Sequence, residues 1–99
     1  METTIIGVTL TDRRELKDLI GIGRAMRKDF EQLAVCSVAQ LATEDPDELY
    51  ERLCRITGAR QDICVLDVFR CAVAQSRDLH LPHEQCQWWW WSRRRLAAK

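Results

Sequence analysis

The residues best suited to chemistry in this chain surround a turn with two glycines. Gly21, Ile22 and Gly23 are followed by a basic cluster that consists of Arg24, Arg27 and Lys28. Two glycines allow a turn tight enough to leave backbone amides unshielded at the start of the next helix, where the helix dipole favours an anion. The side chain between the glycines should point inward. We therefore expect the turn to bind a phosphate, with the three cations as countercharges.

A second chemical feature is a run of four tryptophans followed by a basic cluster, and its residues are Trp88, Trp89, Trp90, Trp91, Arg93, Arg94 and Arg95. Successive residues of a helix differ in direction by about 100°, so the four rings cannot all face one core. One interpretation is a stacking surface for single-stranded or distorted nucleic acid. The alternative is that two rings pack on the core while the others contact a second copy or another protein.

The other reactive side chains lack the spacing of a metal site or an active site. The five cysteines are Cys36, Cys54, Cys64, Cys71 and Cys86. They include none of the close pairs typical of zinc and iron–sulfur sites, although folding could still bring distant thiols together, and we expect buried, reduced thiols. His80 and His83 stand in a predicted loop. Because no nucleophile with a base, phosphate-binding loop or HExxH motif occurs, we predict no catalytic residue, metal or cofactor.

Composition limits the remaining classes of protein. The chain has 99 residues, of which 46% are hydrophobic, and this suits one domain with a single small core. Its 15 basic and 15 acidic side chains cancel, which excludes a uniformly basic nucleic-acid coat. No window approaches the roughly 20 apolar residues of a membrane span, and the N-terminus lacks the basic start of a signal peptide. We expect a cytoplasmic protein that does not contact a membrane.

The elements that position these residues are predicted to be helices, because apolar side chains repeat at three and four residues and only four glycines and two prolines occur. A first helix should begin near Thr11 or Asp12 and stop at Gly21. Its buried side chains are expected to be Leu16, Leu19 and Ile20. A second helix should begin near Arg24, and its inner face should carry Ala25, Met26, Phe30 and Leu33.

Two stronger start signals follow. Ser37 with Gln40 is a capping-box pattern, which predicts a short helix that buries Val38, Leu41 and Ala42. Asp45 followed by proline predicts a helix that ends at Gly58. The inner side chains of that helix are expected to be Leu49, Tyr50, Leu53, Cys54 and Ile56.

The segment 63–74 is apolar around most of its circumference, which predicts a central, buried helix. Asp67 and Arg70 form its narrow polar stripe and are expected to pair with each other at the edge of the core. Leu81, Pro82 and Glu84 mark the start of one further helix, which should carry Cys86 and the tryptophans.

The Gly-Ile-Gly turn and its flanks resemble the helix-hairpin-helix motif, whose turn binds the DNA backbone without reading sequence. The run from Gly21 to Gly58 looks like a tandem pair of such units in a SAM-like bundle. Together with residues 53–58 (LCRITG), residues 62–73 (DICVLDVFRCAV) and the Trp-rich end, it is similar to a small bacterial family of pathogenicity-locus or mitomycin-resistance proteins. The resemblance covers residues 12–95 and implies a helix-hairpin-helix fold that binds DNA.

Two positions depart from the motif. Ile20 stands where many DNA-binding hairpins have proline, and this mainly affects the rigidity of the turn. The second turn, residues 43–46 (TEDP), has no glycine and is acidic, so it should repel phosphate. The resemblance therefore carries DNA contacts over to the first hairpin alone.

Together these observations predict an all-α single domain over residues 1–99, with five or six short helices. Residues 11–58 should form the tandem helix-hairpin-helix, residues 60–77 the central helix, and residues 81–99 a Trp-rich basic helix or tail. The predicted function is sequence-independent DNA binding through the turn, with a link to DNA damage or mitomycin resistance implied by the family. The alternative is a non-enzymatic adaptor that contacts a partner protein through the Trp-rich surface.

Overall fold

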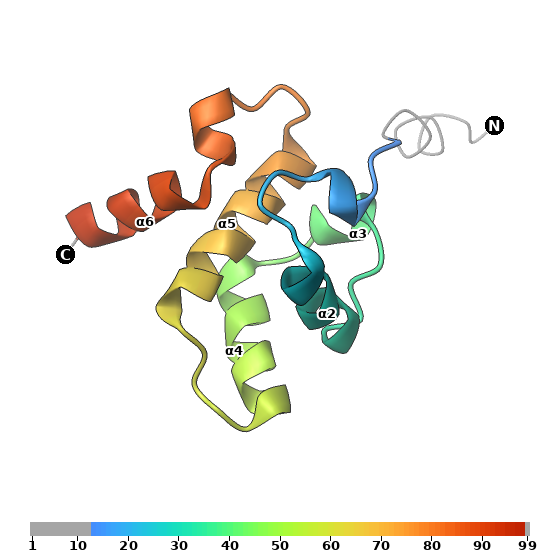
Figure 1. Cartoon of the computed structure of the whole chain (residues 1–99), viewed down its shortest axis with the longest axis vertical. Helices are drawn as coiled ribbons and strands as arrows, with labels where there is room; N and C mark the ends of the chain where they lie inside the picture. The colour runs from blue at the N-terminus through green and yellow to red at the C-terminus, as the bar shows by residue number, and fades with distance from the viewer. Residues whose placement is uncertain (1–12, 99) are drawn as a thin grey trace.

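The computed structural model describes residues 13–98, and a long helix, α5, lies at its centre (Figure 1). Within these residues there are five α-helices, two 3₁₀ helices and no strand, which confirms the predicted all-α fold. In chain order the elements are η1 (Leu16–Asp18), α2 (Arg24–Gln32), α3 (Val38–Leu41), α4 (Pro46–Thr57), α5 (Ile63–Arg77), η2 (His83–Cys86) and α6 (Trp88–Ala97). In the described part of the chain, no helix has the length and apolar character needed to cross a membrane.

The predicted helix starts at Ser37 and Asp45 are both confirmed. The Asp45 carboxylate accepts a hydrogen bond from the Asp47 amide at 2.9 Å, and α4 ends at Gly58, whose φ is +71°. The Ser37 hydroxyl accepts from the Gln40 amide at 3.0 Å. The other half of that capping box is absent, because the Gln40 side chain bonds the backbone of residues 34 and 36 instead.

The predicted first helix is wrong in its described part, while its predicted start at Thr11 or Asp12 lies outside the described residues. Residues 16–18 form a single 3₁₀ turn, and the backbone is extended at Leu19. A helix would pair the Ile20 amide with the carbonyl four residues earlier, but this amide donates to the side chain of Gln75 at 3.0 Å. Consequently the Ile20 side chain, which was predicted to be buried, is 40% exposed.

The core lies between α2, α4 and α5, where the rings of Phe30 and Phe69 stack with their centroids 5.5 Å apart. The predicted buried side chains of α2 to α4 are largely confirmed. Ala25 and Ile56 are exceptions, because both are exposed. They lie in the first turn of α2 and the last turn of α4. Helical periodicity predicts which side of a helix faces the core, but not at which turn the contacts with neighbouring helices end.

The polar residues of α5 pair differently from the prediction. Asp67 is fully buried, and both of its oxygens accept hydrogen bonds from Arg95 of α6, at 3.0 Å from Nε and 3.0 Å from Nη2. Arg70 instead donates to Asp47 of α4 at 2.9 Å. The predicted pair between Asp67 and Arg70 is therefore wrong, because partners on neighbouring helices replace the contact within the helix.

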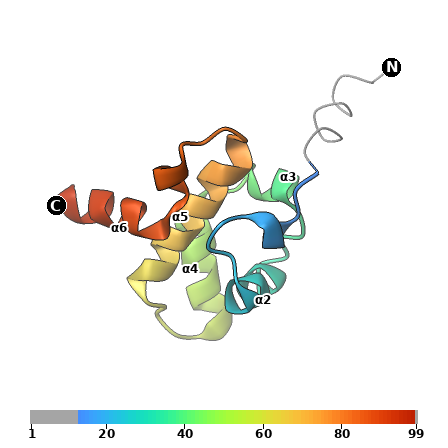
Figure 2. The ribbon, with the colours of Figure 1, turned by 45° about the horizontal axis from the view of Figure 1, so that its top comes forward.

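The last predicted helix is divided into two elements. Gln87 has an extended backbone, with φ −102° and ψ 129°, and separates η2 from α6. After this break α6 packs on α5 and then projects away from the rest of the domain (Figure 2). The ion pair between Arg95 and Asp67 is thus a tether between α5 and the projecting helix.

Loss of this tether should destabilise the protein. Arg95→Ala would leave the Asp67 carboxylate buried without its cation, and we expect Tm to fall by roughly 10 °C or more. Arg94→Ala is a matched control because Arg94 is exposed and stacks on Trp90, so its Tm should change by a few degrees at most. Thermal unfolding followed by circular dichroism measures both. Equal Tm values for the two variants would contradict the tether.

The cysteines divide by burial, since Cys71 and Cys86 are buried, Cys54 and Cys64 are half-buried and Cys36 is exposed. Burial raises the pKa of Cys71 from 9.0 to about 11. Among residues 13–98, no three His, Cys, Asp or Glu side chains come together as a metal site would require. Cys71 is therefore a core side chain that holds its proton more tightly in the folded state than in the unfolded chain.

The raised pKa of Cys71 makes stability depend on pH in the alkaline range. Between pH 9 and pH 11 the unfolded chain releases the thiol proton that the folded protein keeps, so the free energy of unfolding should fall by at most about 3 kcal/mol. Urea unfolding at several pH values measures this slope. Cys71→Ala should flatten it, leaving the contributions of Cys64 and Cys86, whose pKa values burial also raises. An unchanged slope in the variant would contradict the assignment.

Candidate nucleic-acid interface

The Gly-Ile-Gly turn connects η1 to α2. Gly21 has φ +88°, a conformation that favours glycine, and the Ile22 amide donates to the Leu19 carbonyl at 3.3 Å. The Ile22 side chain is buried, as the sequence predicts. Gly23 is the residue that caps the start of α2. The Ile22 amide is thus used within the turn, and the amides that follow it have no partner among the described residues until that of Arg27.

The first turn of α2 offers four backbone amides. The first backbone hydrogen bond of the helix runs from the Arg27 amide to the Gly23 carbonyl at 3.0 Å, and no side chain caps the amides of residues 23–26. A Cβ atom added to Gly21 or Gly23 would meet nothing within 4 Å. Because the backbone of Gly23 is extended and unobstructed, neither conformation nor internal packing requires glycine there. Because Gly23 has no side chain, nothing at this position covers the amides at the start of α2.

The three predicted countercharges Arg24, Arg27 and Lys28 are all exposed. Within residues 13–98, none of them has a carboxylate within ion-pair distance. The nearest acidic residue along the helix is Asp29, and burial raises its pKa. Within residues 13–98, the start of α2 therefore combines unpaired amides with cations that lie within ion-pair distance of no acidic side chain.

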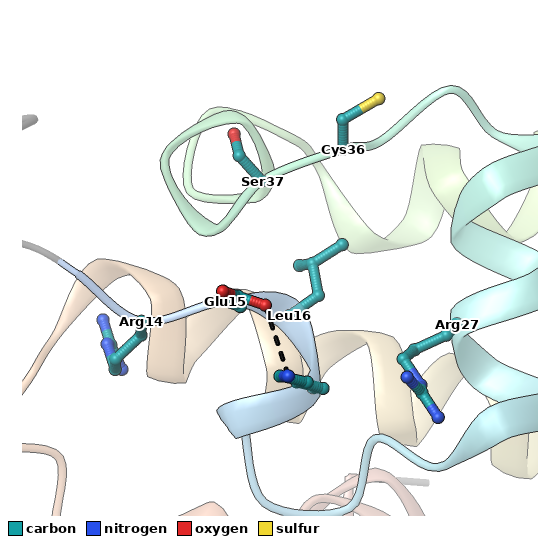
Figure 3. A pocket seen from close by; sticks show the side chains of 7 residues that line it. Arg14, Glu15, Leu16, Arg27, Cys36 and Ser37 are labelled. Atoms are coloured by element: carbon teal, nitrogen blue, oxygen red, sulfur yellow. Dashed lines mark ion pairs between the residues drawn. The ribbon is translucent and has the colours of Figure 1, made fainter.

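Arg27 lies toward η1 across a pocket of about 300 Å³, which Figure 3 shows from close by. The pocket is lined by Arg14, Glu15, Leu16, Lys17, Arg27, Cys36 and Ser37. One of its cations is neutralised, because Lys17 pairs with Glu15 at 3.7 Å. Arg27 is on the opposite wall from Glu15 and has no ion pair with any described residue.

A buried glutamine that sequence reasoning missed holds the turn in place. Gln75 of α5 is 4% exposed, and its side chain accepts from the Ile20 amide at 3.0 Å and donates to the Ile20 carbonyl at 3.0 Å. Arg14 donates to the Gln75 carbonyl at 2.9 Å. The available signal was a glutamine near the end of a mostly apolar helix. The turn is thus anchored to the central helix immediately before its first glycine.

The second turn is engaged by the protein itself. Arg77 of α5 donates to the carbonyls of Ala42 and Glu44, at 2.9 Å each. The Glu44 carboxylate also pairs with Arg52 at 3.7 Å. The carbonyls of this turn are thus bound by Arg77, and the exclusion of residues 43–46 as a phosphate contact stays a prediction.

The Trp-rich surface lies on α6, on the opposite side of α5 from α2 (Figures 1 and 2). Trp88 and Trp89 are exposed, at 42% and 39%, while Trp90 and Trp91 are half-buried. The structure divides the basic residues that follow them, because Arg95 is tied to the buried Asp67. Arg95 is therefore not available to a ligand, and the cations of the predicted Trp-rich surface are Arg93 and Arg94.

Comparison with known proteins gives the family of the chain. The model of the Cdd1 family, described as a pathogenicity locus, matches residues 10–97. The chain belongs to the pathogenicity-locus family. This confirms the family resemblance predicted from residues 12–95. This family member is similar to the mitomycin resistance protein McrB of Streptomyces lavendulae, with 39% identity over 72 residues that cover 73% of this chain and 69% of McrB. No solved structure is significantly similar to it.

The anchoring role of Gln75 in this family member can be tested at one amide. Gln75→Ala should lower the free energy of unfolding by about 1–3 kcal/mol, because both backbone groups of Ile20 lose their partner. Hydrogen exchange of the Ile20 amide should become faster. Gln32→Ala is the matched control, since Gln32 is exposed on α2 and should change stability by less than about 0.5 kcal/mol. Unchanged exchange at Ile20 would rule out the anchor.

Proposed function

We propose that this protein binds the DNA backbone, without sequence preference, through the turn at residues 21–23 and the first turn of α2. The observation that carries the proposal is the set of uncapped amides at residues 23–26 beside three cations that lack an ion pair in the described chain. Amides at a helix start donate to phosphate oxygens, and the helix dipole adds a favourable field. Such contacts fix position on the duplex and do not distinguish bases.

Each residue of the turn has a separate role in this proposal. Gly21 supplies the positive φ that reverses the chain, and Ile22 holds the turn to the core through its buried side chain. Gly23 leaves room for a phosphate to approach the amides. The exposed side chains that neutralise this phosphate and its neighbours are those of Arg24, Arg27 and Lys28.

The helix-hairpin-helix assignment is part of the same proposal. The Gly-Ile-Gly sequence that leads directly into α2 supports it, and so do α3 and α4, which flank the second predicted turn. The described residues contain the short η1 where the motif has its first helix. The two hydrogen bonds between Gln75 and the backbone of Ile20 hold the residue before the turn in place, as a longer first helix would.

We propose further that the protein is non-enzymatic, acts in the cytoplasm, and contributes to resistance at the DNA itself. A relative at 39% identity is named for mitomycin resistance, which supports this connection. Three cations at one turn give weak binding that falls steeply with salt, with a slope in log–log form of about −0.9 per phosphate neutralised. Tight binding therefore requires a second contact, a second copy or a partner protein.

Substitution of Gly23 separates DNA binding from folding. Aspartate and asparagine are both good helix caps, and the extended backbone at residue 23 accepts either side chain, so neither variant should be less stable. Gly23→Asp places a carboxylate where we place the phosphate, and we expect duplex affinity at low salt to fall about tenfold or more. Gly23→Asn adds a side chain of the same size that can cap the same amides, but it carries no charge to repel the phosphate, so it should lose less affinity than Gly23→Asp. Fluorescence anisotropy of a labelled duplex measures both.

A charge reversal provides the control for general electrostatics. Arg27→Glu should weaken duplex binding and reduce the salt slope by about 0.9 or more. Arg55→Glu makes the same change of net charge on the last turn of α4 and should leave most of the affinity intact. If folded Gly23→Asp and Arg27→Glu proteins bound duplex as tightly as the wild type, the turn would not be the DNA site.

A further inference from the structure

The outer face of α6 pairs two indole rings, the exposed Trp89 and the half-buried Trp90, with two exposed guanidinium groups. The Arg93 guanidinium lies 4.7 Å from the ring centroid of Trp89, and that of Arg94 lies 4.8 Å from the centroid of Trp90. Together with Glu84 and Ala97, these four side chains line a hollow of about 410 Å³ on the surface. One helix face thus presents aromatic rings and cations in equal number.

The charge of this face is not neutralised by α6. Residues 88–97 contain no acidic side chain, and neither Arg93 nor Arg94 has an ion pair within the described part of the chain. Among the residues that line the hollow, Glu84 alone is acidic, and it lies on η2 and is exposed. The face is therefore complementary to an anion that also carries flat rings.

Contacts on the inner side of α6 hold this face in place. The Trp91 indole donates to the Gln85 carbonyl at 2.8 Å, and its ring meets that of Trp90 edge to face with centroids 4.9 Å apart. Arg95 secures the helix through the buried Asp67. Because these contacts exist without a ligand, little side-chain entropy remains to be lost on binding.

We propose that this face of α6 binds single-stranded nucleic acid, with bases stacked on Trp89 and Trp90 and phosphates bound by Arg93 and Arg94. A single strand supplies one flat ring and one anion per nucleotide, which matches the equal number of indoles and guanidiniums. Bases of any sequence stack on aromatic side chains, whereas the bases of an intact duplex are already stacked on each other. The site does not depend on the Gly-Ile-Gly turn, since α2 and α6 lie on opposite sides of α5 (Figure 1).

The chain itself provides the probe for this site. All four of its tryptophans are residues 88–91, so intrinsic tryptophan emission reports on α6 alone. We would titrate the full chain at low salt with oligothymidylate, with an abasic strand of equal length, and with the matching duplex. Oligothymidylate should quench the emission and bind about tenfold or more tightly than the abasic strand, because the latter carries phosphates without bases. The duplex should quench weakly.

Variants then assign the two kinds of contact. Trp89→Ala should weaken oligothymidylate binding about tenfold. The double variant Arg93→Ala, Arg94→Ala should reduce the salt slope by about 1.4, whereas Arg55→Ala should leave it nearly unchanged. Gly23→Asp should not affect the quenching, so failure of this site and failure of the turn are distinguishable. Circular dichroism confirms that each variant is folded.

Three outcomes would overturn the proposal. Equal affinity for the abasic strand and oligothymidylate would exclude stacking of bases on the indoles. Quenching by vesicles of anionic lipid but not by oligothymidylate would make α6 a membrane-surface helix. Emission that depends on protein concentration, with no response to oligothymidylate, would make the face a contact between two copies of this chain.

Discussion

Burial of α5 imposes the main constraint on this small domain, because a polar group that is removed from water needs a partner. Asp67 and Gln75 are both buried on this helix, and each finds its partner on a segment distant in the sequence. Asp67 binds Arg95 on α6, while Gln75 binds the backbone of Ile20. These two buried residues therefore act as attachment points, and the elements attached to them carry the two candidate surfaces.

The placement of acidic residues explains how a chain with no net charge can present cations to a ligand. Three of the five acidic residues of α4 and of the turn before it pair with arginines. These ion pairs are Glu44–Arg52, Asp47–Arg70 and Glu51–Arg60. In the described chain, the start of α2 and the outer face of α6 have no such acidic partner. Their positive charge comes from the placement of acidic residues elsewhere, and composition alone does not reveal it.

The two surfaces differ in the part of a nucleic acid that they suit. The start of α2 offers backbone amides and cations without an exposed aromatic ring, which fits the phosphates of any backbone. The outer face of α6 adds indole rings to the cations, which fits strands with unpaired bases. A family member with both could hold duplex and single strand on opposite sides of one helix. This arrangement would suit damaged or partly opened DNA.

The sequence by itself determined the features that depend on near neighbours along the chain. An aspartate followed by proline starts α4, a glycine with positive φ ends it, and four adjacent tryptophans cannot all be buried on one helix. Only the tertiary structure decided the replacement of the first helix by η1, the partner of Asp67 and the anchor of the turn. These contacts join residues 28 and 55 positions apart, and a local pattern carries no information on which distant segment meets a buried polar group.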